Sequence, residues 1–520
     1  MTTRKDIENA LMRGADTLRD TIDAANYKDY VLPVMFLKYL SDSYADAVEA
    51  LSKQYSGIRL ERQKKYLPFM VAEGCSFYDL YKQRFADNIG QLINAAMRQI
   101  EADNNQQLAG VLSSVDYNSE NALGTREHKN AILRDLLEDF EPLNLRPSVI
   151  EIKEGQVPAD VIGDAYEYMI GQFASMAGKK AGSFYTPAAV SEIMARIVNV
   201  QPGERVYDPT CGSGSLLIKA AKKQNSKEVS IYGQEVNGSS VAMAKMNMYI
   251  HEIRDAKIGW GDTLANPVFL DADGNLLLFD AIVANMPFSK DKWASGFNPG
   301  GESSGKGKKE FKMEASLDKF HRFDWGVPPA SKGDWAFLLH MIASLSVNGR
   351  IAAVAPHGVL FRGAAEGRIR QRVVDENLLD AVIGLPENLF YGTSIPACIL
   401  VFKKNRPTTD VLFIDASKTD EDGNPRYIKA SNQNELGQRH IDAIVDAYCN
   451  RTERPKFAHV ATLDEIKENE YNLNIPRYVD TFEEEELIDI SAVQANIAQL
   501  KKEIAEAEAK MDAYLKELGL

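Results

Sequence analysis

Seven short apolar segments between residues 205 and 404 constrain the fold of this chain more than any other feature. They alternate with stretches in which apolar residues recur at helical spacing. This alternation is typical of an α/β protein with a parallel sheet, because successive parallel strands need a crossover helix between them. We therefore expect strands within residues 205–209, 230–235, 257–262, 279–285, 350–356, 379–386 and 397–404.

The regions on either side of this predicted sheet are helical in pattern. Residues 1–155 predict an all-helical N-terminal domain without a catalytic constellation. Near the C-terminus, apolar residues keep a 3–4 alternation for about four heptads, at Ile490, Val493, Ile497, Leu500, Ile504, Ala507, Met511, Tyr514 and Leu518. This pattern favours a coiled-coil-like arm for another chain over a short antiparallel packing helix. We predict that the sheet domain spans 156–475 and the arm 476–520.

The 520 residues carry a net charge of −14, which argues against a protein that binds DNA without a partner. Neutralisation of backbone phosphates dominates such binding and usually requires a basic surface. A nucleic-acid function would therefore need a local basic groove or a partner subunit. The lysine-rich segment 305–312 is either such a contact or a solvated loop.

Neither a membrane span nor a metal site is expected from the sequence. No run of about 18 uncharged apolar residues occurs, and residues 1–14 lack the apolar core of a signal peptide. The four cysteines form no CxxC pair, and the seven histidines form no HxxxH or His–Cys cluster. These features favour a cytoplasmic protein that binds no metal.

A glycine-rich turn, DPTCGSG, follows the first predicted strand. Gly212 and Gly214 allow the backbone to approach a ligand closely, and a helix with free N–H groups follows. A dinucleotide fingerprint is incomplete, because Leu217 stands at the third glycine position. Asp208 directly precedes the turn, Glu235 ends the second predicted strand and Asp262 the third. The carboxylate at 235 suits a ribose diol, and the one at 262 suits an exocyclic amine.

The fourth predicted strand ends in an unusual way, with NMPF. Asn285 offers a side-chain carbonyl, Pro287 imposes a rigid bend, and Phe288 offers a flat apolar face. A pocket for a flat, amine-bearing ring needs these three features. Taken alone, the four residues favour an ordinary strand-to-loop turn over such a pocket.

The order of these motifs resembles the amino-methyltransferases that use S-adenosylmethionine, and within them the DNA adenine-N6 subgroup. The segment AGSFYTP (181–187) precedes the glycine turn, and NMPF follows it. Further segments resemble the modification subunit of type I restriction-modification systems, and the likeness spans about residues 10–480: MFLKYLSD, DWAFLLHMI, NGRIAAVAPHGVLF and LPENLFYGTSIPACILVFKK. The resemblance implies a Rossmann-like methyltransferase sheet with helices on both faces.

The resemblance also implies roles for particular residues. In the family, the target amine donates to the Asn side chain and to the carbonyl of the next residue, here Asn285 and Met286, while the aromatic residue stacks on the flipped base. Met286 replaces the usual proline, which affects the stiffness of the turn and leaves the carbonyl acceptor in place, so we expect activity. The expected cofactor-binding residues are Tyr185, Thr186, Pro187, Asp208, Thr210, Gly212, Ser213, Gly214, Glu235 and Asp262.

The implied partners are double-stranded DNA with a flipped adenine, a DNA specificity subunit and an endonuclease/translocase subunit. We expect the specificity subunit to contact the C-terminal heptads, and the N-terminal helices are a second candidate contact. Two alternatives remain at this point. A protein-glutamine N5-methyltransferase has a similar Asn-Pro-Pro-Tyr motif, and Met286 leaves room for a non-catalytic cofactor-binding scaffold.

Overall fold

The computed structural model describes residues 1–55, 66–177, 185–222, 228–298, 311–390, 393–419, 424–430, 433–481 and 490–518. The chain divides into two units, Met1–Val479 and Asp480–Leu520. The domain boundaries expected at 155 and 475 remain predictions. Among the described residues, no helix combines the length and the apolar character needed to cross a lipid bilayer.

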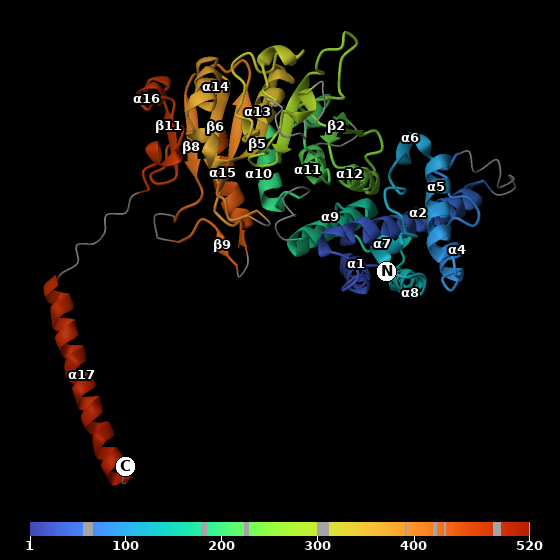
Figure 1. Ribbon diagram of the computed structural model, residues 1–520, viewed down its shortest axis with the longest axis horizontal. Coiled ribbons are helices and arrows are strands. Elements are labelled where there is room, and N and C mark those ends of the chain that lie inside the picture. The colour runs from blue at the N-terminus through green and yellow to red at the C-terminus, as the bar shows by residue number, and fades with distance from the viewer. Residues whose placement is uncertain are drawn as a thin grey trace. The chain divides into compact units, whose positions relative to one another are not determined.

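A nine-stranded sheet forms the centre of the first unit, in the order β11–β8–β6–β7–β5–β4–β1–β2–β3 (Figure 1). All seven expected strands are present: β1 Arg205–Asp208, β2 Ser230–Glu235, β3 Lys257–Trp260, β4 Phe279–Asn285, β5 Leu345–Pro356, β6 Leu379–Gly384 and β7 Ala397–Lys403. Strands β1 to β5 pair in parallel, whereas β7 runs antiparallel to both β5 and β6. The expected Rossmann-like sheet is therefore confirmed, and of the seven expected strands β7 is reversed.

Helices cover both faces of this sheet, as expected. Along β4, Ala281 and Val283 belong to one apolar cluster, while Ile282 and Ala284 belong to the other. This alternation places successive side chains on opposite faces, and both faces are buried. The first cluster includes residues of α10 (Ala188–Val198), α11 (Ser215–Lys222), α12 (Gly238–Ile250) and α15 (Gln438–Asn450), and the second includes residues of α13 (Asp334–Ala343), α14 (Ala364–Asp375) and α16 (Leu463–Glu468).

Two strands of the sheet were not expected from the sequence. Strand β8 (Val411–Asp415) pairs in parallel with β6, and β11 (Ala458–Ala461) pairs antiparallel with β8. A separate hairpin pairs β9 (Ile428–Lys429) with β10 (Asn434–Glu435). Residues 411–461 therefore extend the nine-stranded sheet through β8 and β11, whereas residues 480–520 form the second unit.

The N-terminal region is helical, which confirms that expectation. Its helices are α1 Arg4–Thr17, α2 Tyr27–Gln54, α4 Phe77–Lys82, α5 Ile89–Asp103, α6 Asn105–Leu108, α7 Glu120–Leu123, α8 Arg126–Phe140 and α9 Pro158–Ala177. Helix α1 begins with a capping box between Thr3 and Asp6. In α2, the ring of Phe36 contacts Tyr249 of α12 edge-on at 5.6 Å. The helical region thus shares a core with the helices beside the sheet.

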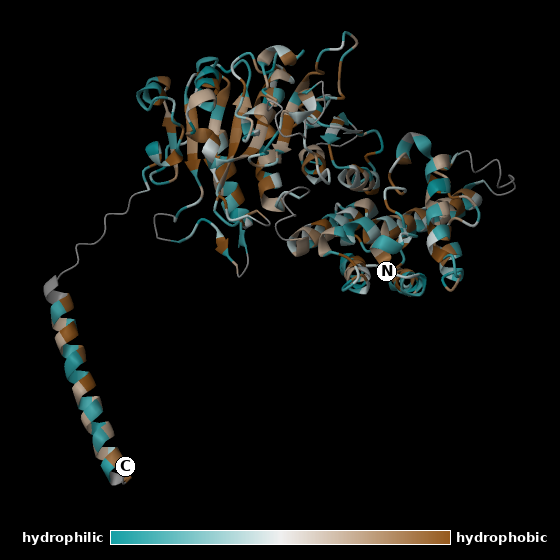
Figure 2. Cartoon of the chain, in the orientation of Figure 1, coloured by the Kyte–Doolittle hydropathy of each residue, from teal (hydrophilic) through white to brown (hydrophobic). Residues whose placement is uncertain are grey.

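The second unit contains helix α17 (Ile490–Glu517). Figure 2 shows apolar residues recurring along this helix between hydrophilic ones. Large apolar side chains of this helix that are at least 44% exposed are Val493, Ile497, Leu500, Ile504, Met511 and Tyr514. The expected C-terminal helix is confirmed, and its apolar seam faces solvent.

Candidate active site

The candidate site lies at the carboxyl edge of the sheet, around β1. The strand order reverses at β1, because β2 and β3 lie on one side of it and β4 and β5 on the other. Ligands of open α/β sheets bind at such a switch point, outside the carboxyl ends of the strands. Asp208 and Glu235 end β1 and β2, Asp262 follows β3, and Asn285 ends β4. The sheet thus brings these four side chains to one edge.

Glu235 holds the glycine-rich turn in place. Its Oε2 accepts from the backbone N–H of Gly212 at 3.0 Å, and its Oε1 accepts from Asn237 N–H at 2.8 Å. Gly212 and Gly214 have φ of +50° and +76°, in the left-handed region that favours glycine. Burial raises the pKa of Glu235, and the backbone donors of Asn237 and Gly212 oppose that shift. Each oxygen keeps acceptor capacity beyond these contacts.

Asp208 is buried directly below the turn, with 2% of its surface exposed. Its Oδ1 accepts from the N–H of Thr210 at 2.8 Å. Desolvation raises the pKa of this carboxyl to about 8, the Thr210 N–H opposes the shift, and the nearby charge of Glu235 adds to it. Few hydrogen bonds offset the cost of burying the ionised carboxyl, so a bound cation would stabilise it.

One small pocket connects the glycine turn to the end of β4. Its lining residues are Tyr185, Thr186, Asp208, Thr210, Cys211, Gly212, Ser213, Ser215, Leu216 and Asn285. The hydroxyl of Thr210 donates to the backbone carbonyl of Asn285 at 3.5 Å, a long contact that spans the two motifs. No hydrogen bond from any residue in the described part of the chain reaches the side chain of Asn285. Its amide is therefore available to a ligand.

The rest of the NMPF segment lies outside this pocket. Met286 is 1% exposed and packs in the apolar cluster that includes Trp293 and Trp335. Phe288 is half-buried, and its ring lies 5.9 Å from that of Phe390 at an interplanar angle of 68°. The pair places aromatic surface in the turn that follows Asn285.

Asp262 and Pro187 occupy structural positions near the site. Asp262 Oδ1 accepts from the N–H groups of Leu264 and Ala265, at 2.9 and 3.2 Å, so it also closes the turn after β3. Pro187 precedes the first turn of α10. Neither residue, nor Gly214 or Glu235, lines the small pocket. Residues 181–184 of the AGSFYTP segment and 305–310 of the lysine-rich segment lie outside the described residues.

Sequence reasoning missed three residues that organise the site, namely Asn247, Asp334 and Arg362. The side chain of Asn247 in α12 donates to the backbone carbonyl of Ser213 at 3.1 Å. Asp334, at the start of α13, accepts from Ser289 N–H just after NMPF and pairs with Arg362. In the sequence, an acidic residue at a helix start such as Asp334 predicts an ordinary helix cap. Its contact with Ser289 is visible only in the folded structure.

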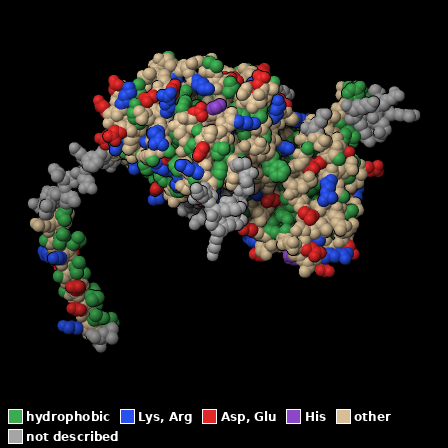
Figure 3. Space-filling view, turned by 45° about the horizontal axis from the view of Figure 1, so that its top comes forward, with side chains coloured by type: hydrophobic (Ala, Val, Ile, Leu, Met, Phe, Trp, Pro, Cys, Tyr) green, Lys and Arg blue, Asp and Glu red, His purple; other side chains and the backbone are tan. Residues whose placement is uncertain are grey.

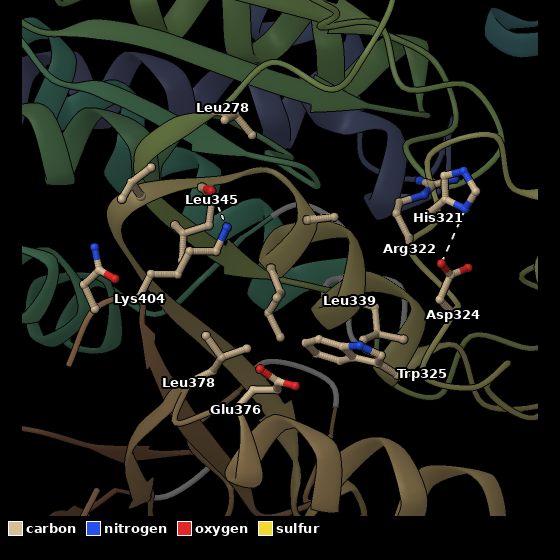
Figure 4. A pocket seen from close by; sticks show the side chains of 14 residues that line it. Leu278, His321, Arg322, Asp324, Trp325, Leu339, Leu345, Glu376, Leu378 and Lys404 are labelled. Carbon is tan, nitrogen blue, oxygen red and sulfur yellow. Dashed lines mark hydrogen bonds and ion pairs between the residues drawn. The ribbon is translucent and has the colours of Figure 1, made fainter. Parts of the chain in front are cut away.

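A larger cavity of about 600 Å³ lies elsewhere and contains none of the expected site residues (Figure 4). Leu278, Leu345 and Leu378 line it and stand at the amino ends of β4, β5 and β6. Lys404 donates to the carbonyl of Leu345 at 2.6 Å on one side, as the dashed line in Figure 4 shows. This cavity therefore lies at the sheet edge opposite the glycine turn.

The sheet order, the glycine turn and the adjoining Asn-x-Pro-Phe turn define a Rossmann-like methyltransferase whose acceptor is an amine. Comparison with known proteins narrows this class. A family model for N-6 DNA methylases matches residues 157–487, and one for the HsdM N-terminal domain matches residues 7–140. The chain belongs to the N-6 DNA methylase family, as a modification subunit of the type I restriction-modification kind.

Relatives and a solved structure agree with this assignment. The chain is 30% identical to the type I restriction enzyme MpnII methylase subunit of Mycoplasma pneumoniae, over 99% of this chain and 96% of that one. It is also 30% identical to the MjaVIII methylase subunit of Methanocaldococcus jannaschii, over 98% and 84%. The crystal structure of a type I methyltransferase subunit from Streptococcus thermophilus has a TM-score of 0.76 and 35% identity, covering 92% of this chain and 100% of that one.

These findings confirm the resemblance drawn from the motifs. The expectation of a DNA adenine-N6 methyltransferase subunit is confirmed at the level of the family. The two alternatives, a protein-glutamine methyltransferase and a non-catalytic scaffold, are not favoured.

Proposed function

We propose that this chain methylates N6 of an adenine flipped out of duplex DNA, at the sheet edge where the glycine turn meets Asn285. The observation that carries the proposal is the Asn285 side chain, which has no bonding partner in the described part of the chain and opens on the same pocket as Gly212 and Ser213. An enzyme that acts on a base must take it out of the stack. The free amide would then receive the exocyclic amine of that base.

The residues around the glycine turn fit S-adenosylmethionine, which the family implies. Asp208 is a buried carboxyl without a cation partner in the described residues, and it lies beside a backbone that bends at two glycines. Glu235 retains acceptor capacity for ribose hydroxyls. Tyr185 and Thr186 complete the pocket wall. When bound, S-adenosylmethionine supplies an electrophilic methyl group on a sulfonium.

Asn285 and Met286 would prepare the acceptor nitrogen. The lone pair of an aromatic amine is delocalised into the ring, so the amine is a poor nucleophile. Hydrogen bonds from its N–H groups to Asn285 Oδ1 and the Met286 carbonyl would favour a tetrahedral nitrogen with a localised lone pair. Phe288 would stack on the base, which contributes on the order of 1–3 kcal/mol. Pro287 would keep these groups in a near-attack geometry.

The raised pKa of Asp208 predicts how cofactor affinity depends on pH. The pKa of Asp208 in the folded chain is about 8, above its ordinary value of 3.8. The protonated carboxyl therefore contributes to the stability of the fold at low pH, and this contribution is lost as the pH rises through about 8. A cationic cofactor held beside Asp208 would stabilise its ionised form and offset that loss. We expect S-adenosylmethionine affinity, measured by calorimetry, to increase from about pH 6 to about pH 8. Asp208→Asn should remove most of this dependence, and a flat wild-type profile would contradict the role of Asp208.

A specificity subunit would supply recognition of the DNA sequence. The chain carries a net charge of −14, and on the face in Figure 3 the basic side chains are interspersed with acidic ones. The exposed seam of α17 is the proposed contact for that subunit, since apolar residues repeat along it at coiled-coil spacing. An endonuclease subunit would join the same assembly.

Site-specific methylation with and without the specificity subunit tests the proposal. The chain alone should bind S-adenosylmethionine and methylate DNA poorly, and addition of the specificity subunit should produce N6-methyladenine at one mapped sequence. Tritium from labelled cofactor should appear in DNA. Label in protein, or robust methylation at one site by the lone chain, would contradict the proposed function.

A further inference from the structure

We propose that Asp334 is a positioning residue that holds the NMPF turn in its working geometry. The inference rests on the proposed function, because it concerns the turn that would receive the adenine amine. Asp334 is 45 residues from Ser289 in sequence and begins helix α13. It is fully buried, with 0% of its surface exposed.

The two carboxylate oxygens of Asp334 connect the NMPF turn, through Arg362, to a second buried acidic residue, Glu366. Oδ1 accepts from the backbone N–H of Ser289 at 2.5 Å, and Oδ2 accepts from Arg362 Nη1 at 2.9 Å. The same guanidinium nitrogen donates to Glu366 Oε1 at 3.0 Å. Glu366 is also fully buried. Arg362 thus compensates two carboxylates, and a buried, satisfied pair of this kind holds its members in one geometry.

The backbone at Ser289 needs such support. Its φ is +50°, which is uncommon for a residue other than glycine and persists where the surroundings over-determine it. Two further hydrogen bonds tie the same loop to the segment before α13. Gly333 N–H donates to the carbonyl of Lys290 at 3.0 Å, and Lys292 N–H donates to that of Ala330 at 2.9 Å.

Met286 explains why an external constraint matters in this chain. A proline at 286 would fix one more dihedral of the turn, and methionine does not. The Met286 side chain is anchored in the apolar core at the start of the turn, and the Asp334 contact at Ser289 follows Phe288 at its end. The turn is therefore held at both ends by contacts with residues remote in sequence.

Three variants of the full chain, assayed with the specificity subunit, test the inference. Asp334→Ala should lower the single-turnover methyl-transfer rate on the order of 10²-fold, because a misplacement of about 1 Å has that effect. Affinity for S-adenosylmethionine and for DNA should stay within about threefold, since neither is bound by Asp334. Asp334→Asn keeps an oxygen for Ser289 N–H and should recover most of the rate. If the alanine variant does not fold, Asp334→Glu keeps the charge and displaces that oxygen, with the same loss expected.

Asp380→Ala is the matched control. Asp380 is a buried carboxylate at the amino end of β6, paired with Lys403, Arg406 and Arg451. The control should lower the melting temperature and leave the rate per folded molecule unchanged. A wild-type rate in Asp334→Ala, or an equal rate loss in both alanine variants, would overturn the inference. Absence of methylation by the wild-type complex would instead refute the proposed function.

Discussion

Replacement of Asn285 by alanine should lower the methyl-transfer rate about 10²–10³-fold, the effect of removing one preorganised polar contact to the reacting group. The side chain of Asn285 lines the pocket of the glycine turn and has no other bonding partner in the described residues. Its loss leaves one N–H of the adenine amine without an acceptor while the lone pair must localise. The cofactor contacts proposed for Asp208 and Glu235 remain, so affinity for S-adenosylmethionine should be unchanged.

Single-turnover rates and calorimetric titration of the cofactor separate these two effects. Asn266→Ala provides a matched control, because Asn266 is an exposed asparagine in the loop after β3, and it should behave like the wild type. If Asn285→Ala turned over normally, Asn285 would have no place in the mechanism. If it lost cofactor affinity to the same degree as rate, Asn285 would be a cofactor contact instead.

The double variant Leu500→Asp/Ile504→Asp should abolish assembly with the specificity subunit. Both side chains are 57% exposed on the seam of α17. Burial of each against a partner helix contributes about 1.5–3 kcal/mol, so loss of both weakens binding by about 10²–10⁴-fold. Site-specific methylation should fall with assembly, while cofactor affinity, which depends on the first unit, should not change.

Ala498→Asp/Ala509→Asp introduces the same charges on another side of α17 and serves as the control. On a helix of 3.6 residues per turn, these positions point away from the row formed by Leu500 and Ile504. Co-purification with the specificity subunit, followed by mapping of methylated adenines, measures both pairs. Equal loss of assembly in the two pairs would indicate a general effect on the helix, and intact assembly in the first pair would exclude the seam as the interface.

The seven strands could be predicted from sequence because apolar runs and turn residues are local signals. The direction of β7 could not be predicted in this way, since parallel and antiparallel strands have the same side-chain pattern when both faces are buried. Strand β8 was not predicted, although its run VLFID is fully buried like that of the predicted strand β6. Strand β11, with the sequence AHVA, has two buried and two half-buried residues, so pairing with β8 defines it more than its own pattern does.

By itself the sequence determined which chemical groups the carboxyl edge carries, because strand ends and glycine turns are encoded by neighbouring residues. Asp208, Glu235 and Asn285 follow from that local pattern. Only the tertiary structure decided which of these groups are already engaged. Glu235 supports Gly212, Asp262 closes its own turn, and Asp334 holds Ser289. Among the described residues, none makes a hydrogen bond to the side chain of Asn285. The physical reason is that a hydrogen bond between residues remote in the chain depends on how helices pack on the sheet, and residue type alone does not encode that distance.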